Sequence, residues 1–172
     1  MGYNEMENTL EKFDFSKIIE KGEKLGDGKT PKRVLFVCTG NTCRSPMAAA
    51  VLNHLGKGEF YATSAGLSAF SGDSISEDAV TALENAGIPC TENNNYKAHR
   101  SRRVTEELLE ECDVAVAISS RHLMSLIYAF PAYAEKLTAM KKDISDPYML
   151  GKDEYAKCLS EMTECIKEMF SI

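Results

Sequence analysis

The sequence lacks a long apolar run: none approaches the ~20 residues that a membrane-spanning helix needs. It also lacks an excess of basic residues, since 20 Lys and Arg stand against 26 Asp and Glu and give a net charge of -6. That balance argues against general affinity for nucleic acid. The first residues are polar and acidic, so we expect no secretory signal peptide. Together these absences predict a cytoplasmic protein with no membrane or nucleic-acid partner.

Metal-binding patterns are absent as well. There is no C-x-x-C pair, and His54, His99 and His122 are scattered along the chain. The 6 cysteines lie within apolar or helical patterns and no export signal accompanies them, so we expect reduced thiols rather than a disulfide framework. The sequence therefore predicts no metal and no other cofactor. It leaves the oligomeric state open.

The 172 residues divide into two regions. Residues 1–32 are charged and run into "GDGKTPKR", a linker punctuated by glycine and proline. Leu10, Phe13, Ile18 and Ile19 in this region could line one face of a helix, and a partly ordered extension is the alternative. We assign the region no activity. Residues 33–172 are long enough for one domain with a sizeable core.

From residue 33 onward, apolar runs alternate with helical patterns. The segments "RVLFV", "EFYATSAG", "DVAVAIS" and "KLTAM" suit buried parallel strands. Helices are expected from Ser45-Pro46, from Ser76 to Gly87, from Thr105, in "SRHLMSLIYAF", and over the closing segment. In that segment Tyr155, Leu159, Met162, Ile166 and Met169 repeat at intervals of three or four. The pattern predicts a single, doubly wound α/β domain of the flavodoxin-like type, with a four-stranded parallel sheet flanked by helices on both faces.

The segment "CTGNTCRS", residues 38–45, follows the first expected strand and leads into a helix N-terminus. Ligands of open parallel sheets bind beyond the carboxyl ends of the strands, and free amides at a helix N-terminus attract anions. Gly40 and Asn41 tolerate left-handed backbone angles, so the loop can curl with its N–H groups inward. Arg44 adds a planar fork that suits two phosphate oxygens. The segment therefore predicts a phosphate-binding loop.

Cys38 stands at the base of this loop. A helix N-terminus and a nearby arginine favour the thiolate form of a cysteine, and a thiolate held beneath a phosphorus atom is a nucleophile. The Ser45 hydroxyl can donate a hydrogen bond to that sulfur. A packed cysteine beside a surface arginine is the structural alternative.

The segment "VLFVCTGNTCRSPMA" resembles the phosphate loop of the low-molecular-weight protein tyrosine phosphatases. "TSAG" from Thr63, "AHRSRRVTEELLEECD" from Ala98 and "DISDPY" from Asp143 resemble further family segments, in family order. The resemblance covers residues 33–170. It implies that Cys38 forms a phosphocysteine, that Arg44 stabilises the phosphoryl charge and that Asp146 is the general acid. It further implies that the loop residues bind phosphate, through Thr39, Gly40, Asn41, Thr42, Cys43 and Ser45.

The same resemblance implies supporting roles outside the nucleophile. Asn41, Ser64 and His99 would hold the loop backbone. Taken singly, Asn41 also fits a turn residue, Ser64 a hydroxyl at a strand end, and His99 a surface histidine. Tyr148 would form one wall of the substrate cleft, with a partly buried loop tyrosine as the alternative. Cys43 could form a reversible disulfide with Cys38 or serve only packing.

Thr42 departs from the aliphatic residue that many family members carry at this position, commonly isoleucine in "GNICRS". The segment "CTGNTCRS" instead resembles the subgroup that dephosphorylates protein arginine. Phosphotyrosine and phosphoarginine on proteins both remain open as substrates. Two functions of other classes also remain: a thiol-dependent arsenate reductase, and a non-catalytic phosphoprotein-binding module.

Overall fold

The computed structural model describes residues 31–172, so the helix expected between Leu10 and Ile19 lies outside the described residues. Its sheet contains the strands β1 (Lys32–Cys38), β2 (Phe60–Gly66), β3 (Val114–Ala117) and β4 (Leu137–Ala139). All neighbouring strands are parallel, in the order β2-β1-β3-β4. The prediction of a four-stranded parallel sheet is therefore confirmed.

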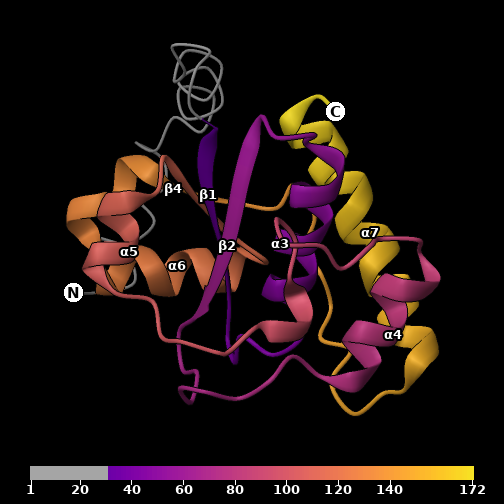
Figure 1. The fold of residues 1–172 in the computed structure, drawn as a ribbon. Helices are drawn as coiled ribbons and strands as arrows, with labels where there is room; N and C mark the ends of the chain where they lie inside the picture. Colours follow the sequence, from indigo (N-terminus) through magenta and orange to yellow (C-terminus); the bar gives the residue numbers. More distant parts are fainter. Residues whose placement is uncertain (1–30) are drawn as a thin grey trace.

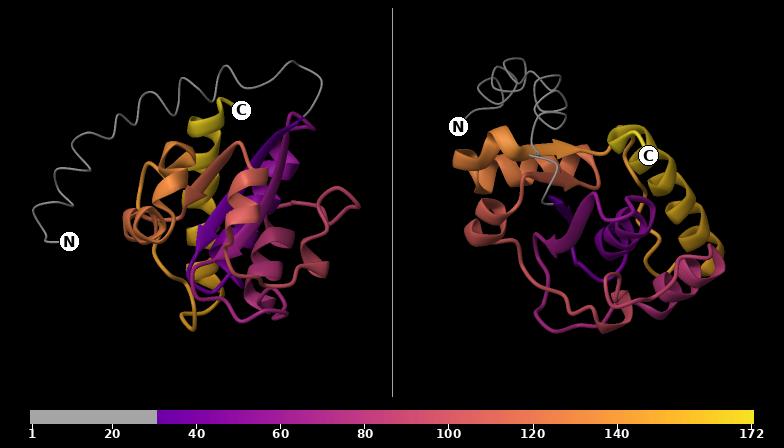
Figure 2. Two further views of the ribbon diagram at one scale, coloured as in Figure 1. Left: turned by 90° about the vertical axis from the view of Figure 1, so that its left-hand side faces the viewer. Right: turned by 45° about the horizontal axis from the view of Figure 1, so that its top comes forward.

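Helices cover both faces of this sheet (Figure 1). The α-helices are α3 (Arg44–Leu55), α4 (Glu77–Asn85), α5 (Glu106–Glu111), α6 (Ser120–Ala129) and α7 (Lys152–Phe170), and the short 3-10 helices are η1 (Tyr96–Ala98) and η2 (Pro131–Lys136). Figure 2 shows α3, α4 and α7 on one face of the sheet and α5 and α6 on the other. The architecture is the doubly wound α/β arrangement that the alternating pattern predicts.

The strand β1 lies in the middle of the sheet and contributes to a core on each face. Val34, Phe36 and Cys38 face the cluster formed with α3 and α7, whereas Leu35 and Val37 face the cluster formed with α5 and α6. Both faces of a central parallel strand are buried, which explains why this segment is almost continuously apolar. Cys38 therefore ends the strand inside the larger core.

Several helices begin at capping residues that the sequence identifies. The Ser76 and Thr105 side chains accept hydrogen bonds from the third residue of α4 and α5, respectively. The helix α3 begins at Arg44, earlier than the expected start at Ser45-Pro46. Proline fits there because the first N–H groups of a helix have no intrahelical acceptor. This early start brings the Arg44 side chain onto the first turn, next to the loop.

Strand β2 lies at one edge of the sheet. The Asn53 side chain in α3 covers part of this edge, since its Nδ2 donates to the Ala62 carbonyl at 2.9 Å and its Oδ1 accepts from the Ala62 N–H at 2.7 Å. A side-chain amide thus occupies backbone groups that another strand could otherwise pair with.

Residues 31–172 contain neither a candidate membrane-spanning helix nor a metal-binding cluster of side chains. No α-helix in this part of the chain is long and apolar enough to cross a membrane. No group of three or more His, Cys, Asp or Glu side chains in the same part is arranged to hold a metal ion.

Candidate active site

The site lies at the carboxyl end of the sheet, where residues 39–43 connect β1 to α3. Cys38 ends β1 with 2% of its surface exposed. Its Sγ accepts a hydrogen bond from the Asn41 N–H at 3.3 Å and lies 3.0 Å from Ser45 Oγ. The Ser45 hydroxyl has a second acceptor, the Ala65 carbonyl at 3.3 Å. A thiolate at Cys38 would draw the hydroxyl hydrogen toward sulfur, because charge-assisted hydrogen bonds are the stronger ones.

Asn41 holds the loop in its curled shape. Its φ of 58° lies in the left-handed region, which asparagine tolerates better than most residues. Its Nδ2 donates to Ser45 Oγ and to Ser64 Oγ, both at 2.9 Å, and its Oδ1 accepts from the Arg102 N–H at 2.9 Å. Its carbonyl accepts from His99 Nε2 at 2.7 Å. The side chain therefore joins the loop to β2 and to the segment after η1.

His99 donates to that carbonyl while it is partly buried. Burial lowers the pKa of its imidazole, and the charges of Arg102 and Arg100 act in the same direction. A neutral ring with hydrogen on Nε2 is sufficient for this contact. The structure thus places Asn41, Ser64 and His99 in one hydrogen-bonded group around the loop.

Arg44 connects the loop to a segment far away in the sequence. The residue is 7% exposed, and its Nη2 forms an ion pair with Asp146 Oδ2 at 2.6 Å. Its Nη1 lies 3.5 Å from the Ile144 carbonyl. The Asp146 side chain is 53% exposed and therefore remains accessible from the solvent side. The fold thus brings a guanidinium and a carboxylate together at the open side of the loop.

The second half of the loop contacts α4 and α7. The Thr42 carbonyl accepts from the Ser76 N–H at 2.9 Å, and Thr42 Oγ1 lies 3.6 Å from Cys43 Sγ. Cys43 Sγ lies 3.0 Å from the Tyr155 hydroxyl, which accepts from Ser76 Oγ at 3.3 Å. Burial raises the pKa of Tyr155. Cys38 and Cys43 are both free thiols, so their disulfide stays a prediction.

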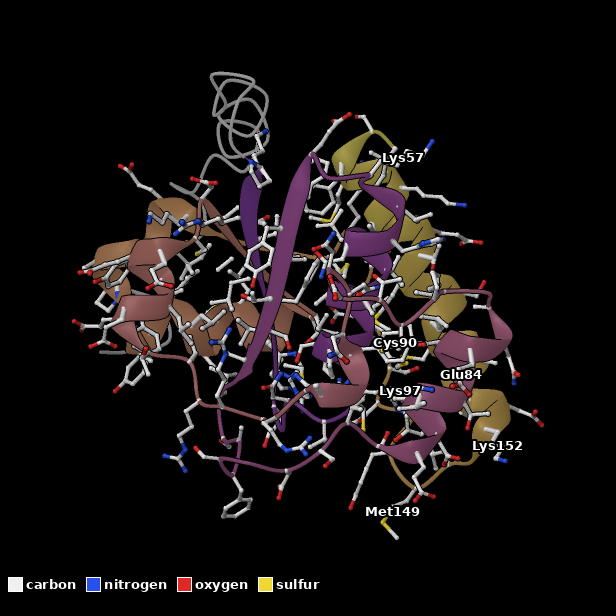
Figure 3. The ribbon with its side chains drawn as sticks, viewed as in Figure 1. Lys57, Glu84, Cys90, Lys97, Met149 and Lys152 are labelled. Atoms are coloured by element: carbon white, nitrogen blue, oxygen red, sulfur yellow. The ribbon has the colours of Figure 1, made fainter. Side chains whose placement is uncertain are left out.

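An exposed apolar rim follows Asp146. Tyr148, Met149 and Leu150 are 61%, 85% and 62% exposed, and Figure 3 shows Met149 pointing away from the protein. The Tyr148 N–H donates to Asp146 Oδ1 at 3.2 Å. The backbone of Tyr148 is thus held beside the carboxylate, while its side chain is exposed.

Two site residues were missed by the sequence reasoning. His122 lies in the first turn of α6 and contacts Thr39, and Tyr155 lies in the first turns of α7 and contacts Cys43. His122 carries no local motif, and Tyr155 occupies a regular core position of an amphipathic helix. Only the packing of the helices against the loop assigns either residue to the site.

Comparisons with known proteins agree with this geometry. The family profile described as "Low molecular weight phosphotyrosine protein phosphatase" matches residues 33–171. A protein-arginine-phosphatase from Geobacillus stearothermophilus is 33% identical over 148 residues, which cover 78% of this chain and 95% of that protein. A low molecular weight protein-tyrosine-phosphatase from Streptomyces coelicolor is 31% identical over 153 residues, which cover 77% and 87%.

A solved structure is similar over the same region. The low molecular weight protein tyrosine phosphatase from T. tengcongensis superposes with a TM-score of 0.74 at 34% identity, covering 81% of this chain and 98% of that one. The profile, the relatives and the structure agree with the resemblance carried by the loop motif. The chain therefore belongs to the low molecular weight phosphotyrosine protein phosphatase family, and it is a protein phosphatase.

Proposed function

We propose that this enzyme hydrolyses phosphorylated protein side chains through a phosphocysteine at Cys38. The observation that carries the proposal is the position of Cys38 Sγ inside the curled loop, with the Asn41 N–H at 3.3 Å and the Ser45 hydroxyl at 3.0 Å. Donors aimed at a sulfur atom favour its anionic form, which is the nucleophilic one.

In the first step, Cys38 Sγ attacks phosphorus and forms the S–P bond while the bond to the leaving group breaks. The loop amides and the Arg44 guanidinium hold the phosphoryl oxygens, which carry the charge of the transition state. Arg44 is held by the first turn of α3 and by its contacts with Asp146 and Ile144, so its position is set before a substrate binds. Preorganised charge of this kind needs no rearrangement during the reaction.

Asp146 is proposed as the general acid and then the general base. Its proton passes to the leaving atom as the bond to phosphorus breaks, because an unprotonated phenolate or guanidine is a poor leaving group. In the second step the Asp146 carboxylate takes a proton from water, whose oxygen attacks phosphorus and releases Cys38. The exposed side of Asp146 supports this assignment, since both the leaving group and the water approach from there.

We further propose phosphoarginine as the preferred substrate. Thr42 places a hydroxyl in the half-buried part of the loop, where an aliphatic side chain would suit a phenyl ring better. The relative from Geobacillus stearothermophilus, named a protein-arginine-phosphatase, supports this choice. Phosphotyrosine is the second candidate, supported by the relative from Streptomyces coelicolor, which is named a tyrosine phosphatase.

Arsenate reduction is disfavoured by the state of two of the other thiols, Cys112 and Cys158. A reductase must pass a disulfide outward through further reactive cysteines. Burial raises the pKa of Cys112 to about 11 and that of Cys158 to about 12, so both thiols are protonated at neutral pH. Protonated thiols are poor nucleophiles for disulfide exchange.

The mechanism is tested by intact mass spectrometry of Asp146→Ala after mixing with a phosphopeptide. We expect a covalent phosphoenzyme that accumulates in this variant and is absent from the double variant with Cys38→Ser. Phosphopeptide binding without any phosphoenzyme or hydrolysis would instead indicate a non-catalytic binding module. Oxidation of thioredoxin that depends on arsenate would indicate a reductase.

Substrate preference is tested with peptides that differ only in phosphoarginine or phosphotyrosine. Thr42→Ile should shift the ratio of kcat/KM toward phosphotyrosine, whereas Thr42→Ser should keep the wild-type ratio because it keeps the hydroxyl. An unchanged ratio in Thr42→Ile would show that Thr42 does not select the substrate.

A further inference from the structure

His122 is a buried titratable residue that the mechanism above does not use. It lies in the first turn of α6 with 6% of its surface exposed. Its Nδ1 lies 2.8 Å from Ser119 Oγ, and its Nε2 lies 2.9 Å from Thr39 Oγ1. Thr39 directly follows the nucleophile Cys38 and is exposed. A buried imidazole thus contacts the hydroxyl next to the nucleophile.

The hydrogen bonds around Ser119 favour hydrogen on the Nε2 atom of His122. Ser119 is the N-cap of α6, and its Oγ accepts from the His122 backbone N–H at 3.4 Å. Its own hydroxyl hydrogen is then free to donate to Nδ1 at 2.8 Å. With that hydroxyl donating to Nδ1, the ring hydrogen sits on Nε2 and is donated to Thr39 Oγ1, whereas hydrogen on Nδ1 would make the Thr39 hydroxyl the donor to Nε2.

The ring is neutral in the working range of pH. Burial and, to a smaller extent, the charges of Arg44 and Arg121 lower the pKa of His122 to about 4, against the opposing charges of Asp146 and Asp143. The contact with Thr39 places the ring beside the phosphate-binding loop. A neutral imidazole has one N–H group, and in this tautomer it donates that hydrogen from Nε2 to Thr39 Oγ1.

This donor occupies one lone pair of the Thr39 hydroxyl and leaves the other available at an exposed residue. A phosphorylated guanidinium presents N–H groups beside the phosphorus atom, whereas the phenyl ring of phosphotyrosine presents none. We propose that Thr39, positioned by His122, is a specificity-determining residue that accepts a hydrogen bond from the N–H groups of phosphoarginine. The inference rests on the proposed function and adds a second polar residue to Thr42.

The substrate contact is tested by comparing Thr39→Val, which keeps the shape, with Thr39→Ser, which keeps the hydroxyl. A hydrogen bond to a charged donor is worth about tenfold in kcat/KM. We expect Thr39→Val to lower kcat/KM for the phosphoarginine peptide about tenfold more than for the phosphotyrosine peptide, and Thr39→Ser to keep the wild-type ratio. The matched control is Thr81→Val in α4, a half-buried residue whose hydroxyl donates to the Glu77 carbonyl at 2.9 Å.

The positioning role is tested at His122 itself. His122→Asn retains a polar atom near Ser119 but is too short to reach Thr39, whereas His122→Gln places an amide nitrogen near the position of Nε2. We expect His122→Asn to change the substrate ratio as Thr39→Val does, with no further change in the double variant, and His122→Gln to restore part of the ratio. Additive effects would show that His122 does not act through Thr39.

Nitrogen NMR of the wild-type enzyme distinguishes the two tautomers of the His122 ring. We expect the His122 ring to be neutral with hydrogen on Nε2, and hydrogen on Nδ1 would overturn the inference. Equal losses on both peptides in Thr39→Val would overturn it too. Failure of the wild-type enzyme to hydrolyse either peptide would instead overturn the proposed function, so the two failures are distinguishable.

Discussion

Gly66 is the point where β2 touches the phosphate-binding loop. A Cβ atom at this position would lie 2.6 Å from the Thr39 carbonyl oxygen and 3.0 Å from the Cβ atoms of Asn41 and Ala69. The strand has little freedom to retreat, because the Gly66 N–H donates to the Arg102 carbonyl at 2.9 Å. We therefore predict that Gly66→Ala displaces the loop rather than the strand.

The size of the displacement follows from these distances. Ordinary contacts of a Cβ atom begin at 3.4 Å, so the Thr39 carbonyl must move by 3.4 minus 2.6, or about 0.8 Å. A shift of ~1 Å in a catalytic group costs about 100-fold in rate, and overpacking of this kind costs about 1–3 kcal/mol of stability. We expect kcat to fall by about 30- to 100-fold and the melting temperature by about 3–10 °C.

The assay is steady-state hydrolysis of p-nitrophenyl phosphate, with a thermal melt of the same samples. Gly40→Ala is the matched control for stability, since a Cβ there meets only Thr42 Oγ1 at 3.8 Å, and we expect it to melt within about 2 °C of wild type. A Gly66→Ala enzyme with wild-type kcat would refute the argument that this close approach sets the loop position.

Three further predictions concern stability and the wider site. The pKa of His122 is about 4 in the folded chain and 6.5 in the unfolded chain. As the pH falls, the unfolded chain therefore binds the proton first, and protonation favours unfolding. The free energy of unfolding should fall by about 3 kcal/mol as the pH drops from about 6.5 to 4. Urea melts across this range should show that slope in wild type and a flatter one in His122→Asn. Asn53→Ala should lower the free energy of unfolding by about 1–2 kcal/mol in the same melts, since both Ala62 backbone contacts are lost. Tyr155→Phe should slow alkylation of Cys43 by iodoacetamide, followed by peptide mass spectrometry, because the hydroxyl that can donate to this sulfur and favour its thiolate is removed; an unchanged rate would contradict this.

Much of the fold was predictable because its signals are local. The apolar run of β1 indicates a strand that is buried on both faces, and the capping side chains of Ser76 and Thr105 mark the starts of α4 and α5 correctly. The start of α3 was placed late, because proline is compatible with more than one position of a first helical turn. Such errors of one or two residues are typical of helix ends.

The candidate site was predictable only where its residues share one short segment. Cys38, Asn41 and Arg44 follow one another within the loop, so their chemistry can be read from their order. Asp146 was assigned by family resemblance, and nothing local in "SDPY" distinguishes it from an ordinary turn. His122 carries no comparable signal, because its partner Thr39 lies 83 residues away.

The sequence by itself determined the alternation of strands and helices and the anion-binding character of the loop, because hydrophobic periodicity and backbone preferences act over a few residues. The tertiary structure alone decided which distant groups complete the loop. It brought Asp146 to Arg44, Tyr155 to Cys43 and His122 to Thr39. These pairs depend on how helices pack against the ends of the strands, and that packing is a property of the whole core rather than of any segment.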